Sequence, residues 1–94
     1  MSGPAVDPAA IAETILRLCA ERGPAKSICP SEVARALAGP DERVWRLLMH
    51  PVRREAFRLA DAGRIEVLRK GRPISPTEAR GVIRLRIRNE TERE

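Results

Sequence analysis

The sequence predicts a single α+β domain, with helices over residues 8–62 and strands over residues 65–88. Up to residue 62, apolar residues recur every three to four positions, as on one face of a helix; beyond it they alternate with polar residues, as in a strand. Gly-Pro pairs at 23–24 and 39–40 divide the helical part into three. A chain of 94 residues has room for one domain of this kind.

The first predicted helix covers residues 8–22. Asp7 precedes it as a capping acid, and Pro8 stands at its first position, where a missing N–H costs nothing. The segment that follows is short, and we expect a strand of two or three residues near 25–28.

The second predicted helix begins at Pro30 and ends at Gly39 after about two turns. Cys29 occupies its capping position, where serine or threonine is the stronger cap. The start of this helix is therefore weak unless Ser27 or Ser31 supplies the cap.

The third helical stretch is the longest and covers residues 42–62. Pro51 interrupts it, because proline has no N–H to donate to Leu47 and crowds the carbonyl of that residue. We therefore expect a kink or short break at residues 49–51. Gly63 is the expected stop, since glycine tolerates the left-handed backbone that ends many helices.

Two strands are predicted after this helix, at residues 65–69 and 82–88. In the second, isoleucine and leucine point one way and arginine the other, in strict alternation. The loop between them, residues 70–81, is too long for a tight hairpin. Within it, residues 75–78 form a capping box with proline at the first helical position, which favours one helical turn.

This order of elements is that of a winged helix-turn-helix domain. The two-turn helix and the long, kinked helix after it form the helix-turn-helix, and the C-terminal β-hairpin forms the wing. We place the domain at residues 7–88, between an N-terminal tail, 1–6, and a polar C-terminal tail, 89–94.

Six stretches also carry a family resemblance. They are I-C-P-S-E-V-A-R-A-L (28–37), W-R-L-L-M (45–49), V-R-R-E-A (52–56), L-A-D-A-G-R-I (59–65), R-K-G-R-P (69–73) and G-V-I-R-L-R (81–86). In these stretches the chain resembles a small bacterial winged-helix family of unknown function. The resemblance implies the winged-helix fold and a bacterial source, and it implies no catalytic residue and no ligand.

Positive charge is concentrated in one part of the chain. Residues 41–88 hold thirteen basic and six acidic residues, a net charge of +7, and twelve of the thirteen bases are arginine. Residues 1–40 are neutral and the tail carries −2. Because the planar guanidinium suits phosphates and guanine edges, this distribution favours a nucleic-acid partner.

The candidate contact residues lie on the second helix of the helix-turn-helix, on the wing and on the last strand. In this motif the second helix enters the major groove, and we take that helix to be residues 51–62. The predicted DNA-binding residues are Arg53, Arg54, Arg58, Arg69, Lys70, Arg72, Arg84 and Arg86. The alternative is a solvated basic face, partly paired with Glu55 and Asp61, beside a basic turn that protects a sheet edge. The strand cations share a surface with the helix only if they face it.

Two functions follow from these observations. The first is binding of double-stranded DNA, as in a small transcriptional regulator; a symmetric DNA site would need a homodimer, and the oligomeric state stays open. The second is a protein-interaction module whose arginine surface docks an acidic protein, since the chain has no sensor region and its acidic tail would repel DNA.

Other classes of function are disfavoured. No nucleophile–base pair is evident, and His50 stands alone, so we expect no enzyme. Cys19 and Cys29 lack C-x-x-C spacing, so we expect reduced thiols and neither metal nor cofactor. Without a signal peptide or a long apolar run, the chain is expected in the cytoplasm, away from membranes.

Overall fold

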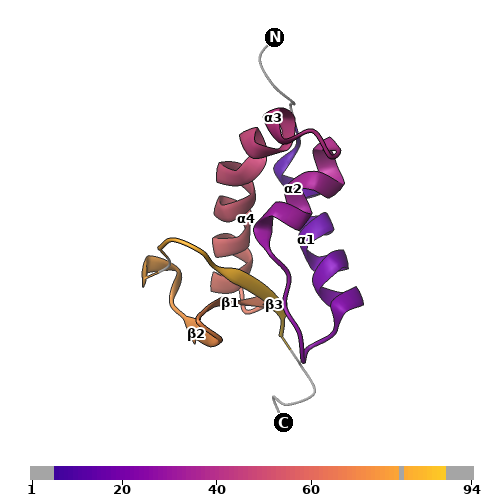
Figure 1. Cartoon of the computed structure of the whole chain (residues 1–94). Coiled ribbons are helices and arrows are strands. Elements are labelled where there is room, and N and C mark those ends of the chain that lie inside the picture. Colours follow the sequence, from indigo (N-terminus) through magenta and orange to yellow (C-terminus); the bar gives the residue numbers. More distant parts are fainter. Residues whose placement is uncertain (1–5, 79, 89–94) are drawn as a thin grey trace.

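The computed structural model describes residues 6–78 and 80–88 and shows helices followed by an antiparallel sheet (Figure 1). The helical part consists of α1 (Pro8–Arg22), α2 (Pro30–Ala38), α3 (Glu42–Trp45), a 3-10 turn η1 (Arg46–Leu48) and α4 (Met49–Asp61). The sheet consists of β1 (Ile65–Arg69), β2 (Arg72–Ile74) and β3 (Arg84–Ile87), with a 3-10 turn η2 (Pro76–Glu78) before β3.

The first two helices confirm the prediction. Asp7 Oδ1 accepts a hydrogen bond from the N–H of Ala9 at 3.3 Å, and α1 ends at the predicted residue. The start of α2 differs in its cap, because neither Ser27 nor Ser31 supplies one. Instead Cys29 and Glu32 form a capping box, in which the Glu32 carboxylate accepts the N–H of Cys29 at 2.9 Å.

The break in the third helical stretch lies earlier than predicted. It falls in η1, residues Arg46–Leu48, and not at residues 49–51. Pro51 is the third residue of α4, within the first turn, where backbone N–H groups have no partner inside the helix. Proline therefore fits the start of a new helix, and the expected kink or short break is present directly before the predicted residues.

The predicted loop at residues 70–81 contains a strand that the sequence analysis missed. Lys70 and Gly71 have φ values of +54° and +79° and form a two-residue turn between β1 and β2. Positive φ at both positions is the requirement of the tightest hairpin turn, and glycine meets it without strain. The helical turn predicted at 75–78 is confirmed as η2, where Ser75 Oγ accepts the N–H of Thr77 at 3.2 Å.

The sheet has the order β2-β1-β3, and a single residue extends it. Ile28 exchanges two backbone hydrogen bonds of 2.8 Å with Leu85, so the short strand expected at 25–28 is reduced to one bridge. Both polar backbone groups of Leu85 point to Ile28. Ile28 therefore lies on the edge of β3 opposite β1.

The helices pack on one face of this sheet. Ile15, Val33 and Val52 from the helices and Val67 and Leu85 from the strands are almost completely buried in one aliphatic core. Three helical segments packed on a C-terminal sheet form a winged-helix-like arrangement, as predicted. No helix in the described part of the chain combines the length and apolarity needed to cross a membrane.

Candidate nucleic-acid interface

The sheet divides the predicted DNA-binding residues between its two faces. Leu85 is buried against the helices, so its neighbours in β3, Arg84 and Arg86, point to the opposite side. We call that side the outer face; from their register, Glu66, Leu68 and Pro73 lie on it as well. Arg84 and Arg86 therefore do not share a surface with the cations of α4, which packs on the inner face.

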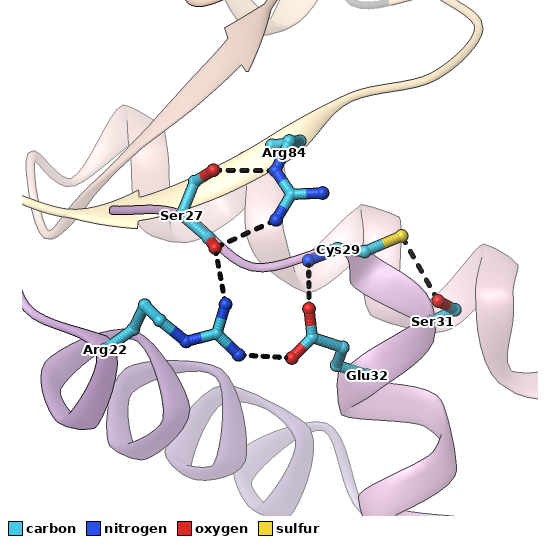
Figure 2. A network of polar contacts seen from close by, with 6 residues as sticks. All are labelled: Arg22, Ser27, Cys29, Ser31, Glu32 and Arg84. Carbon is cyan, nitrogen blue, oxygen red and sulfur yellow. Dashed lines mark hydrogen bonds and ion pairs between the residues drawn. The ribbon is translucent and has the colours of Figure 1, made fainter. Parts of the chain in front are cut away.

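Hydrogen bonds hold both outer-face arginines in place. Arg84 donates from Nε to Ser27 Oγ at 2.7 Å and from Nη2 to the Ser27 carbonyl at 2.9 Å (Figure 2). Arg86 donates from Nη2 to Glu66 at 2.6 Å, across the strand pair. These two side chains tie β3 to the segment before α2 and to β1.

Arg58 is neutralised within α4 itself. Its Nε donates to Glu55 at 2.9 Å, and the carboxylate of Glu55 is almost completely buried. A buried carboxylate requires a charged or hydrogen-bonding partner, because its desolvation is costly otherwise. This pairing makes Arg58 a poor donor to an external phosphate. Pairing with Glu55 was part of the alternative interpretation, a solvated basic face.

Arg53 joins α4 to the segment before β3. Its Nη1 donates to the carbonyl of Gly81 at 3.1 Å, and its guanidinium lies 5.5 Å from the centre of the Phe57 ring. This contact brings the segment before β3 beside the middle of α4, and Figure 1 shows the chain after β2 reaching that side of the helix. It also places Arg80, an exposed cation next to Gly81, near Arg53.

Four of the predicted residues are exposed, and their side chains have no hydrogen bond or ion pair to another residue of the described ranges: Arg54, Arg69, Lys70 and Arg72. Arg69 and Arg72 are directly opposite each other in the hairpin. Arg69 lies two residues after Val67, whose side chain is buried in the core. By strand alternation both point to the inner side, where the helices lie. Lys70 stands at the tip of the turn.

Arg80 is a candidate that the sequence analysis missed. It lies in an irregular segment with no periodic pattern, and only the contact between Arg53 and Gly81, 28 residues apart, brings it near α4. We call Arg54, Arg69, Arg72 and Arg80 the helix-side cations. They come from α4, from the hairpin and from the segment before β3.

The contacts of Arg84 with Ser27 belong to a larger polar network where α1, α2 and β3 meet (Figure 2). Arg22 donates to Glu32 at 2.7 Å and to the Ser27 carbonyl at 2.9 Å. Burial by itself would raise the pKa of Glu32, but the N–H of Cys29 and the guanidinium of Arg22 outweigh it, and the pKa is lowered. This network fixes the start of α2, the first helix of the helix-turn-helix.

The two cysteines are free thiols in different surroundings. Cys19 is buried in the core, and this burial raises the pKa of its thiol to about 12. Cys29 is half-buried and accepts a hydrogen bond from Ser31 Oγ at 3.1 Å. Within residues 6–78 and 80–88, no group of three histidine, cysteine or acidic side chains is arranged to hold a metal ion.

The chain matches a protein-family model over most of its length. The model of the family described as "Protein of unknown function (DUF3253)" matches residues 8–88, which include every described helix and strand. No curated protein matches the chain.

Proposed function

The chain belongs to the DUF3253 family, whose description assigns no activity, and we propose from its own geometry that it binds double-stranded DNA. The observation that supports this proposal is the hydrogen bond between Arg53 and Gly81, because it holds the segment before β3, which carries Arg80, beside α4. The helix and wing of such a domain bind adjoining parts of the duplex, in its major and minor grooves or along the backbone.

The helix-side cations and Lys70 form the proposed contact surface. In this proposal Arg54 would enter the major groove from α4, and Arg80 would contact the neighbouring phosphates. Arg69, Lys70 and Arg72 at the end of the hairpin would meet the next stretch of backbone or a narrow minor groove, where arginine is favoured by the negative potential. A small transcriptional regulator is the role that suits such a module.

The proposal predicts how strongly the affinity for DNA depends on salt concentration. Five cations with no internal partner in the described structure allow about five phosphate contacts, and each contact adds about 0.9 to the slope of log K against log salt concentration. We therefore expect a slope of about −4 to −5 for random-sequence duplex DNA, measured by fluorescence anisotropy.

Paired variants test the surface itself. The double variant R54A/R80A should lower the slope by about 2 and weaken binding to all sequences. The control R17A/R43A also removes two exposed arginines, but these lie on α1 and α3, outside the proposed surface. Equal loss of affinity in both variants would contradict the proposed surface. A slope near zero in the wild type would contradict DNA binding altogether, and nuclease-resistant recovery of one acidic protein would then support the interaction module.

A further inference from the structure

A pocket lies at the hairpin end of the sheet, and the outer-face residues Leu68 and Arg84 are among those that line it. It has a volume of about 400 Å³, within the range of small-molecule sites. The residues that line it are Ser27, Leu68, Arg69, Lys70, Gly71, Val82 and Arg84. It therefore lies between the hairpin turn and the segment that leads into β3.

Two apolar side chains make this pocket unusual for a solvent-facing surface. Leu68 is only 6% exposed, yet it points away from the main core and is not part of that cluster. Val82 is 83% exposed, more than the other large hydrophobic residue at the described surface, Leu47 at 56%. An apolar group placed between Leu68 and Val82 would be removed from water on two sides, which is favourable in proportion to the area covered.

A preorganised cation stands beside these apolar groups. The two hydrogen bonds from Arg84 to Ser27 fix the guanidinium, and Figure 2 shows its third nitrogen, Nη1, without a partner among the residues drawn. An arginine that is already held loses little side-chain entropy when it binds a carboxylate. Arg69 and Lys70 add two further cations to the lining, and none of the described residues that line the pocket is acidic.

From this combination we infer that the pocket binds a small organic carboxylate with an apolar body. The carboxylate binds Arg84 and Lys70, and the apolar body covers Leu68 and Val82. Arg69 and Lys70 belong both to this pocket and to the proposed DNA-binding surface. If the proposed function holds, ligand and DNA compete for these two residues.

Titration of the full chain without DNA tests the pocket independently of the proposed function. We would follow backbone amide shifts in ¹⁵N spectra with three probes: hexanoate, which has charge and apolar body; acetate, which has only the charge; and 1-hexanol, which has only the apolar body. Hexanoate should cause saturable shifts at Ser27, Leu68, Gly71 and Val82, with an affinity at least about ten-fold above those of acetate and hexanol. Equal affinity for all three probes, or shifts spread over the helices, would overturn the inference.

Surface variants that leave the core untouched provide the second measurement. V82E should weaken hexanoate at least about ten-fold by repelling the carboxylate, whereas L47E, a matched change on η1, should leave it unchanged. K70N removes one cation and keeps a residue type that accepts positive φ; it should weaken hexanoate several-fold, and R17Q on α1 should not. Unchanged affinity in V82E and K70N, with native spectra, would show that the pocket is not the binding site.

Discussion

Replacing Glu32 by glutamine tests the polar network that starts the helix-turn-helix. In the native protein one carboxylate oxygen accepts the N–H of Cys29 and the other accepts the guanidinium of Arg22. Glutamine keeps a side-chain oxygen for Cys29, as in the glutamine form of the capping box, but it removes the negative charge. Alanine removes both interactions. The two substitutions therefore separate the cap from the charge.

The structure sets the size of both effects. The side chains of Arg22 and Glu32 are 40% and 27% exposed, so solvent screens their ion pair and limits it to about 0.5 kcal/mol. The loss of a negative charge at the positive end of α2 adds about 0.5 kcal/mol. E32Q should therefore lower the free energy of unfolding by about 1 kcal/mol, and E32A by about 2 kcal/mol, since a lost cap costs about 1 kcal/mol.

The dependence on pH gives the decisive comparison. Because the pKa of Glu32 is lowered in the folded state, its charge stabilises the fold above the ordinary value of 4.5, and this contribution is lost as the pH falls through the folded-state pKa. In urea unfolding, the gap between wild type and E32Q should be full near pH 7 and should close progressively below 4.5. The deficit of E32A should persist in part, because a protonated carboxyl group still accepts the N–H of Cys29. A gap for E32Q that does not change with pH would refute this reasoning.

Three further predictions follow from the turn, the thiols and the core. G71A should lower the free energy of unfolding by about 1 kcal/mol, because alanine is strained at positive φ; a Tm lowered by about 4–8 °C would be the readout. In the folded protein Cys29 should react with a thiol reagent much faster than Cys19, whose thiol is buried and has a raised pKa; equal rates would contradict this. L85A should cost about 2–5 kcal/mol in chemical denaturation, since Leu85 is fully buried between β1 and Ile28.

Elements marked by local signals were predictable from the sequence. Asp7-Pro8 and Gly23 mark the two ends of α1 correctly, and the alternation at residues 65–69 gives the bounds of β1. The strand β2 was missed for a physical reason. It has only three residues, one of them proline, and its turn uses Lys70 where asparagine or glycine is the usual signal. A strand this short can be identified only by its pairing with β1, and the sequence of β2 alone does not reveal that pairing.

The position of the helix break was misjudged because proline has two opposite effects. Inside a helix it removes a hydrogen bond, but in the first turn its fixed φ favours the start of a new helix. The sequence around Pro51 does not distinguish the two cases. The structure shows the second, with η1 ending the previous segment and α4 beginning two residues before the proline.

The available positive charge is the quantity that the sequence overestimates most. Composition counts all three arginines alike, but the carboxylates of Glu55 and Glu66 pair with Arg58 and Arg86, and Ser27 fixes Arg84 on the outer face of the sheet without cancelling its charge. Two of these partnerships join residues 57 and 20 positions apart, so only the fold reveals them. Arginine suits both roles, because its planar guanidinium has five N–H donors and can bridge two structural elements or bind a phosphate. The cations that remain for a partner lie at the hairpin turn, on the exposed side of α4 and at Arg80, which the hydrogen bond between Arg53 and Gly81 brings beside α4.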